Sequence, residues 1–262
     1  MGIVNVTPDS FSDGGRFFGT KDAIAQGLRL HEDGADLVDV GGQSTRPGSE
    51  PVPLDEELGR VMPVLEALVR EGVAVSVDTM KPGVMRAAIG AGCAVVNDVN
   101  AFRAPGAIEA VADAGVGVVA MHMQGTPQTM QQAPEYDDVV REVAGFLRER
   151  ALALESAGVD RDRIALDPGF GFGKTLEHNR RLFQALPTLA AMGYALLVGV
   201  SRKRMIADLT GGRPVGERTA GSVAAALLAA QNGASLLRVH DVRETVDALN
   251  VWLALRSPEM KP

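Results

Sequence analysis

Acidic, amide and basic side chains stand at the ends of short apolar segments along this whole sequence. Asp78, Asn97 and Asp167 each follow such a segment closely, and Lys203 and Arg238 accompany two later ones. Any one of the acidic or amide residues could simply cap the helix that follows it. If parallel strands carry them, however, all their carboxyl ends meet at one face, where barrel enzymes place their active sites.

Carboxylate and amide groups together can bind the polar edge of a flat heterocycle. An amino-pyrimidinone edge presents adjacent hydrogen-bond donors and acceptors, which Asp78, Asn97 and Asp167 could match in one plane. Asp78 would also stabilise positive charge that develops on such a ring. These residues therefore predict a site for a polar heterocycle, with Asp78 taking part in the chemistry.

Basic residues late in the chain predict an anion site beside that heterocycle. Lys203 and Arg238 could flank the ring and bind anionic groups. His240 and the backbone after the eighth apolar segment fit the phosphate site that barrels often place near strands seven and eight. Asn5 could reach a Mg²⁺ ion held by a pyrophosphate, because Mg²⁺ prefers oxygen ligands and keeps several waters. We therefore expect Mg²⁺ as cofactor, with Asn5 as its protein ligand.

The elements that would position these groups alternate along the chain. Near-continuous apolar segments, typical of parallel strands buried on both faces, cover residues 2–6, 36–40, 73–77, 94–96, 116–121, 163–166, 195–200 and 235–239. Amphipathic segments that predict helices cover residues 21–32, 54–70, 82–91, 107–114, 137–157, 176–192, 217–232 and 243–255. Eight β-then-α units of about 33 residues each match an α/β (β/α)8 TIM barrel.

The sequence predicts a single domain, although a second architecture is also compatible with the alternation of strands and helices. An open doubly wound sheet would also alternate strands and helices, but eight evenly spaced units favour closure. No linker or change of composition divides the sequence, so we expect a single domain over residues 1–262, with its active site at the carboxyl ends of the strands. Residues 1–6 already read as a strand, so we also expect a segment ahead of them that covers the barrel floor.

Two long loops on the predicted active-site face carry further polar residues. Residues 7–20 and 41–53 are rich in Gly, Ser, Asp and Pro, and long loops in compact domains tend to be functional. Both could close over a substrate. By contrast, residues 169–175 (GFGFGKT) only superficially suggest a nucleotide-binding P-loop, because the spacing between its glycines is wrong.

Composition limits the classes of partner and compartment. The net charge of −7 argues against broad binding to nucleic acid or anionic membranes. Hydrophobic residues make up 46% of the chain but aromatic residues only 4%, so the core must consist mainly of Ala, Val, Leu and Ile. The single cysteine, Cys93, excludes an internal disulfide framework and suits a reducing cytosol. With no apolar run long enough to span a bilayer, we expect a cytoplasmic protein.

At this point the motifs resemble a known family, the dihydropteroate synthases. Residues 2–15 (GIVNVTPDSFSDGG) and 36–48 (DLVDVGGQSTRPG) look like its first two signatures. Further matches, in family order, are SVDT at 76–79, VND at 96–98, MHMQG at 121–125, LDPGFGFGK at 166–174, SRK at 201–203 and RVH at 238–240. The resemblance therefore extends over nearly the whole chain, and eight motifs in register are highly specific.

The resemblance implies a reaction and the residues that carry it out. The family joins 6-hydroxymethyl-7,8-dihydropterin diphosphate to p-aminobenzoate and releases pyrophosphate, by a proposed dissociative route. It implies catalytic roles for Asp39, Asp78, Lys203 and Arg238. It implies a pterin pocket made by Asp78, Asn97, Met121, Asp167, Gly171, Phe172, Lys203 and Arg238. Sulfonamides inhibit such enzymes because they mimic p-aminobenzoate.

The same resemblance assigns the other two sites. It implies a p-aminobenzoate site formed by Phe11, Thr45, Arg46, Pro47, Lys203 and Arg204. It implies pyrophosphate binding by Asn5, Arg46, Arg238 and His240, with Asn5 acting through Mg²⁺. This chain departs from the pattern at Arg204, where some members carry serine.

Two other functions remain compatible with part of the pattern. Related pterin-binding methyltransferases share the Asp–Asn–Asp trio, but they have no p-aminobenzoate site for residues 44–48 and 201–203 to form. A non-catalytic pterin-binding barrel would be expected to lose Arg238, His240 or the first loop, and this chain retains all three. The Ala-rich segment 217–232, with Gly221 and Ser222, could serve packing within the barrel or form a homodimer surface, since the family typically pairs through its late helices.

Overall fold

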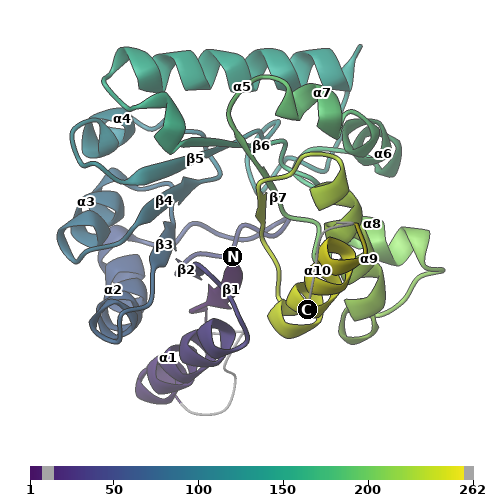
Figure 1. The fold of residues 1–262 in the computed structure, drawn as a ribbon. Helices are drawn as coiled ribbons and strands as arrows, with labels where there is room; N and C mark the ends of the chain where they lie inside the picture. Colours follow the sequence, from purple (N-terminus) through teal and green to yellow (C-terminus); the bar gives the residue numbers. More distant parts are fainter. Residues whose placement is uncertain (8–14, 257–262) are drawn as a thin grey trace.

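The computed structural model describes residues 1–7 and 15–256, in which strands and helices alternate as the sequence predicts (Figure 1). The eight strands are parallel and lie side by side in chain order. They are β1 (Gly2–Asn5), β2 (Val38–Gly41), β3 (Val75–Asp78), β4 (Val95–Asp98), β5 (Gly117–Met121), β6 (Ile164–Asp167), β7 (Ala195–Val198) and β8 (Leu236–Leu237).

The sheet curls until its last strand meets its first. The Ile3 N–H donates to the Val239 oxygen at 3.1 Å, and the Val239 N–H donates to the Met1 oxygen at 3.0 Å. Gly2 and Val239 form a parallel bridge there. These bonds close the sheet into a barrel. The open doubly wound alternative is wrong, since its strand order reverses at a switch point whereas this order never does.

The main helices form a ring outside the barrel (Figure 1). They are α1 (Gly15–Glu32), α2 (Leu54–Arg70), α3 (Pro82–Gly90), α4 (Ala107–Val111), α5 (Val139–Ser156), α6 (Leu176–Gln184), α7 (Leu186–Ala190), α8 (Arg204–Leu209), α9 (Thr219–Gln231) and α10 (Val242–Arg256). Within the described ranges, no helix has both the length and the apolar character needed to cross a bilayer.

Several predicted boundaries are wrong, each for a local reason. The predicted helix 176–192 divides at Ala185 into α6 and α7, because Pro187 lacks the N–H that would continue the first helix. Residues 15–20, expected in a loop, belong to α1, and α4 ends at Val111 rather than at residue 114. The short helix α8 was not predicted, since six residues carry too little periodicity to be recognised.

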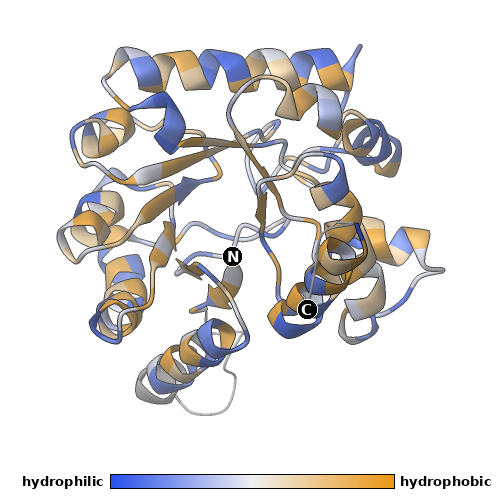
Figure 2. Cartoon of the chain, viewed as in Figure 1, coloured by the Kyte–Doolittle hydropathy of each residue, from blue (hydrophilic) through white to orange (hydrophobic). Residues whose placement is uncertain are grey.

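Apolar side chains fill both sides of the sheet, as the low aromatic content requires. Hydrophobic residues dominate the strands, and the surrounding helices alternate hydrophobic with hydrophilic residues (Figure 2). Inside the barrel, a small cluster of Val119, Ala165 and Leu197 joins neighbouring strands. Met121 and Asp167 each follow a member of this cluster by two positions, so they point to the same face one layer higher. The apolar cluster is therefore the floor on which a polar layer lies at the carboxyl ends of the strands.

Candidate active site

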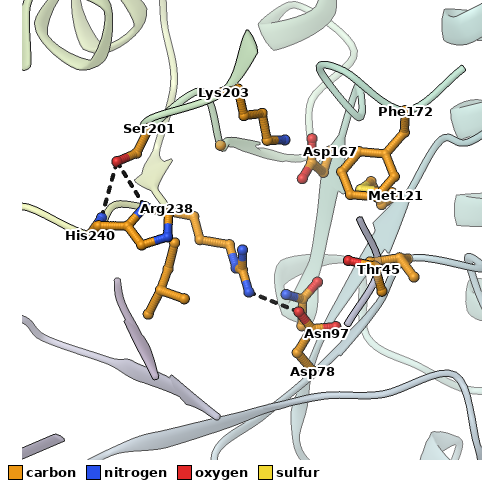
Figure 3. Close-up of a pocket in the computed structure, with 13 residues that line it drawn as sticks. Thr45, Asp78, Asn97, Met121, Asp167, Phe172, Ser201, Lys203, Arg238 and His240 are labelled. Atoms are coloured by element: carbon orange, nitrogen blue, oxygen red, sulfur yellow. Dashed lines mark hydrogen bonds and ion pairs between the residues drawn. The ribbon is translucent and has the colours of Figure 1, made fainter. Parts of the chain in front are cut away.

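A cavity lies at the carboxyl ends of the strands, above the apolar floor (Figure 3). It brings together these predicted site residues: Thr45, Asp78, Asn97, Met121, Asp167, Phe172, Lys203, Arg238 and His240. They come from strand ends and loops spread over almost the whole chain. Closure of the barrel is what places them within one cavity.

Arg238 crosses the mouth of the barrel and is held there by two carboxylates. Its Nε donates to Asp39 Oδ2 at 2.6 Å, and its Nη2 donates to Asp78 Oδ2 at 2.8 Å. Asn97 Nδ2 donates to the same Asp39 oxygen at 3.1 Å. Asp39 is completely buried and does not line the cavity, so it acts on the site through Arg238 and Asn97.

Burial and charge work against each other in this cluster. Burial raises the pKa of Asp78 to about 7 even though Arg238 opposes the rise, and the neighbouring carboxylate of Asp39 adds to it. Burial alone would lower the pKa of Arg238, but Asp39 and Asp78 outweigh burial and raise that pKa above its ordinary value. Arg238 therefore stays charged, and Asp78 is the group in the cluster whose charge is most easily changed.

A second charged group faces this cluster from the opposite wall. Lys203 Nζ donates to the Phe170 oxygen at 2.6 Å and lies 4.7 Å from the centre of the Phe172 ring. Asp167 Oδ1 accepts the Gly169 N–H at 2.7 Å. Burial lowers the pKa of Lys203 to about 8, although Asp167 opposes that shift. Burial raises the pKa of Asp167, which Lys203 opposes.

Apolar groups lie between the two polar walls. Figure 3 shows the Phe172 ring close to the Met121 side chain, with Asp167 and Lys203 to one side and Asp78 and Asn97 below. Met121 is buried and Phe172 packs against its cluster. A slot with hydrogen-bonding edges and apolar faces suits a flat, polar ring.

Ser201 and His240 form a hydrogen-bonded pair at the third side of the cavity. The His240 N–H donates to Ser201 Oγ at 3.1 Å, and Ser201 Oγ lies 3.1 Å from His240 Nδ1. Ser201 Oγ can donate its proton to Nδ1 or accept a second bond from it, according to which ring nitrogen carries the proton. Burial lowers the pKa of His240 to about 4, and Arg238 adds to this effect. His240 is therefore neutral near pH 7 and offers a hydrogen bond rather than a charge to an anion.

Predicted residues on the second loop lie at the rim of the cavity. Thr45 is half-buried and lines the cavity, whereas Arg46 and Pro47 are exposed. The Gly48 N–H donates to the Pro127 oxygen at 3.0 Å, which ties this loop to the loop after β5. Arg46 therefore stands at the entrance rather than among the buried groups.

Other predicted residues do not reach the cavity through their side chains. The Arg204 side chain is 93% exposed and lies 3.8 Å from Asp208, one turn along α8. Gly171, with a φ of +82°, contributes only backbone, and its oxygen accepts a bond from Gln131 at 2.5 Å. Asn5 ends β1 and is half-buried outside the cavity lining. Phe11 lies outside the described residues.

Three lining residues were missed by the sequence interpretation. They are Ile3, Val99 and Gly199. Strand alternation could have indicated Ile3, which shares a face with Asn5 on β1. Gly199 lies beside Arg238, since a Cβ there would be in ordinary contact with the Arg238 Cβ at 3.6 Å, but no local pattern in the sequence indicates this. Val99 follows β4 without any distinguishing signal.

Comparison with known proteins agrees with this geometry. Residues 1–240 match the family of pterin binding enzymes. The dihydropteroate synthase of Escherichia coli K12 is 49% identical over 252 residues, covering 96% of this chain and 89% of the relative.

Solved structures give the same result at the level of the fold. Xanthomonas albilineans dihydropteroate synthase with 4-aminobenzoic acid has a TM-score of 0.94 and 58% identity, covering 99% of this chain and 93% of the other. The same enzyme in complex with 7,8-dihydropteroate has a TM-score of 0.89 and 55% identity, covering 99% and 94%. Family, relatives and fold agree over nearly the full length, so the chain belongs to the dihydropteroate synthase family of pterin binding enzymes.

Proposed function

We propose that this chain condenses 6-hydroxymethyl-7,8-dihydropterin diphosphate with p-aminobenzoate to give 7,8-dihydropteroate and pyrophosphate, as a single-domain enzyme of the cytoplasm. The observation that carries the proposal is the cavity at the carboxyl ends of the strands. There two carboxylates and an amide face a lysine and an arginine, with an apolar slot between them. The complexes of the Xanthomonas albilineans enzyme with 4-aminobenzoic acid and with 7,8-dihydropteroate support this choice of substrates and product.

The pterin would occupy the cavity between the two polar walls, with Met121 and Phe172 packing near its ring. Asp78, Asn97 and Asp167 would take the donors and acceptors of its amino-pyrimidinone edge, because carboxylates accept and an amide both accepts and donates. Lys203 would donate to the ring from the opposite wall, and Gly171 would border it through its backbone. Arg238, already held flat by Asp39 and Asp78, would stack on the open face of the ring.

The reaction would be dissociative. The bond between the pterin methylene carbon and the diphosphate oxygen breaks, and its electron pair leaves with pyrophosphate. The arylamine nitrogen then attacks the methylene cation, and the new C–N bond forms as the amine loses a proton. The carboxylates of Asp78 and Asp167 would stabilise the cation, while Arg238 and Lys203 would stabilise the departing charge. The protein contributes orientation and electrostatics, with no covalent intermediate.

The p-aminobenzoate would bind at the rim, beside the departing group. Thr45 and Lys203 would meet it within the cavity, and Arg46 would bind its carboxylate from the entrance, with Pro47 enclosing it. Phe11 would add to the same enclosure. Because the Arg204 side chain points to solvent, position 204 would contribute through the backbone at the start of α8. Sulfonamides, which mimic p-aminobenzoate, would compete here.

The pyrophosphate would lie near Arg238, Arg46 and the neutral ring of His240. Among the described residues, no group of three or more His, Cys, Asp and Glu side chains is placed to hold a metal ion. The Asn5 amide oxygen together with diphosphate oxygens and waters fits Mg²⁺, which is commonly held by few protein ligands plus substrate phosphates. Mg²⁺ bound there would neutralise charge on the leaving group.

A homodimer would form through α9 and α10. These helices carry large exposed apolar side chains, among them Leu228, Val251 and Leu255. A groove between them is lined by Leu227, Val251, Trp252 and Leu255. Contiguous exposed apolar surface marks interaction sites, and two-fold pairing lets one patch cover its own copy.

The central test is pyrophosphate release with and without p-aminobenzoate. The native protein should release pyrophosphate only when p-aminobenzoate is present and should form dihydropteroate. Asp78→Asn should lower kcat by about a hundredfold or more, because a neutral amide stabilises the cation poorly, while circular dichroism and thermal unfolding stay close to native. Pterin binding without release in the native protein would favour a methyltransferase or a non-catalytic barrel instead.

Arg46→Ala should weaken the binding of p-aminobenzoate more than the binding of the pterin diphosphate. Loss of the guanidinium should raise the KM for p-aminobenzoate by about tenfold or more, because a charge-assisted bond to its carboxylate is lost. Calorimetric affinity for the pterin diphosphate should fall far less, because Arg238 and His240 would still bind its diphosphate. A matched control is Arg180→Ala, which removes an exposed arginine on α6. If pterin affinity fell instead, the proposed division of the site would be wrong.

The pH dependence should report the charge of Lys203. With a pKa of about 8, Lys203 loses its proton as the pH rises through that value, so kcat/KM for the pterin diphosphate should fall on the alkaline side. Lys203→Arg should lower the rate but abolish that alkaline decline, because arginine stays protonated. An identical alkaline limb in the variant would assign the titration to another group.

The oligomeric state can be checked by sedimentation velocity. The native protein should sediment as a dimer, and Val251→Glu should give a monomer, because a buried, unpaired carboxylate opposes pairing. Leu152→Glu on α5 is the matched control, since Leu152 is comparably exposed on another face. A monomeric native protein, or a dimer that survives Val251→Glu, would contradict the proposed interface.

A further inference from the structure

The loop between β6 and α6 is held through its backbone carbonyl groups. Five successive carbonyl oxygens, those of residues 169–173, each accept a hydrogen bond from a side chain. The donors are Lys174 Nζ to Gly169 and Phe172 at 2.9 and 3.0 Å, Lys203 Nζ to Phe170 at 2.6 Å, Gln131 Nε2 to Gly171 at 2.5 Å and Tyr136 Oη to Gly173 at 2.8 Å. We call residues 169–173 the carbonyl loop.

The carbonyl loop needs these donors because its backbone forms little regular structure. Gly169, Gly171 and Gly173 have φ angles of +68°, +82° and +61°, which turn the chain at every second residue. The loop also packs closely on the end of β5, since a Cβ at Gly169 would lie 1.9 Å from the His122 oxygen. Its conformation therefore depends on glycine and on the side chains that bind its oxygens.

Lys174 is the most deeply buried of the donors. It is 3% exposed, and besides its two carbonyl partners it lies 2.9 Å from His122 Nδ1. Burial lowers the pKa of His122 to about 3, so the ring is neutral and Nδ1 can accept. With the His122 carbonyl oxygen at 3.5 Å, four acceptor atoms thus surround the ammonium. Burial lowers the pKa of Lys174 to about 7, and the charge of Asp167 opposes that shift.

We propose that Lys174 is a positioning residue for pterin binding: its buried ammonium fixes the carbonyl loop, and the loop in turn fixes Phe172 and the oxygen that binds Lys203. The proposal rests on the proposed function, because it assumes that Phe172 and Lys203 contact the pterin. Lys174 itself does not line the cavity. It therefore acts on the substrate only through the loop.

The charges around Lys174 agree with this role. The titratable groups that face it are His122 from the end of β5, Asp167 from β6, Lys203 after β7 and His178 from α6. Asp167 is the acidic group among them, and the charge of Lys203 also acts on it. Lys174 thus contributes a second positive charge near a buried carboxylate proposed to bind the pterin edge. Its loss would disturb the loop and Asp167 together, whereas Thr45 and Arg46 at the rim belong to a different loop, the one after β2.

The test is Lys174→Met, which removes the ammonium and keeps most of the stem. Pterin affinity is measured by calorimetry with the pterin diphosphate, and both KM values by pyrophosphate release. We expect the pterin Kd and KM to rise by about tenfold or more, since displaced contact groups cost binding steeply. The KM for p-aminobenzoate should rise far less, because its proposed site shares only Lys203 with the pterin pocket. Equal pterin affinity, or an equal rise in both KM values, would overturn the proposal.

Two further variants separate positioning from general loss of stability. Leu154→Ala removes a fully buried side chain of α5 and should lower the melting temperature while leaving pterin affinity within about twofold. If Lys174→Met does not fold, pterin affinity is measured on Lys174→Gln instead. The glutamine amide can donate to one or two of the carbonyl oxygens but carries no charge. A selective loss of pterin affinity supports the proposal and native affinity overturns it. Calorimetry needs no turnover, so a native protein that binds pterin without forming dihydropteroate would contradict the proposed function alone.

Discussion

The ion-paired Arg238 is the interaction on which the arrangement of the cavity depends. Its guanidinium joins β8 to Asp39 on β2 and to Asp78 on β3, and 199 positions of sequence separate it from Asp39. Removing charges from water costs several kcal/mol per ion unless partners and hydrogen bonds compensate. Arg238 can therefore be buried only where β8 lies beside β1 and near β2, which is the arrangement that closes the barrel. Closure of the barrel and neutralisation of the charges of Arg238, Asp39 and Asp78 therefore depend on each other.

At the opposite wall of the cavity, buried charges are also compensated by partners, but the residues are different. The charges of Lys203 and Lys174 both act on Asp167, and both lysines donate to carbonyl oxygens of the loop after β6. Each wall thus combines carboxylate with cation, so neither carries a large uncompensated charge into the interior. The apolar pair of Met121 and Phe172 separates the two walls. A polar ring can lie between them without forcing the protein to rearrange its charges, which lowers the cost of binding.

The sequence predicted the strand ends well and the side-chain directions beyond them poorly. Asp78 and Asp167 are the last residues of β3 and β6, and they meet because parallel strands share one direction. The resemblance placed Arg204 in the p-aminobenzoate site, yet its side chain points to solvent. Arg204 is the first residue of α8, with Lys203 as the N-cap, and the sequence pattern did not predict this short helix. Lys174 stood inside a recognised motif, but its acceptors come from residues 122, 169 and 172, so only the folded chain assembles them.

One contact in the cavity invites a different chemical interpretation. Ser201 and His240 lie within hydrogen-bonding distance, as the nucleophile and base of a covalent enzyme do. A base that activates serine needs a pKa near the working pH, and a third group that supports its charged form. Burial and the adjacent Arg238 hold the pKa of His240 near 4, so the imidazole is a weak base that resists protonation. Arg238 thus also keeps this pair from acting as a nucleophile and its base, which agrees with the proposal that charge and orientation displace the diphosphate.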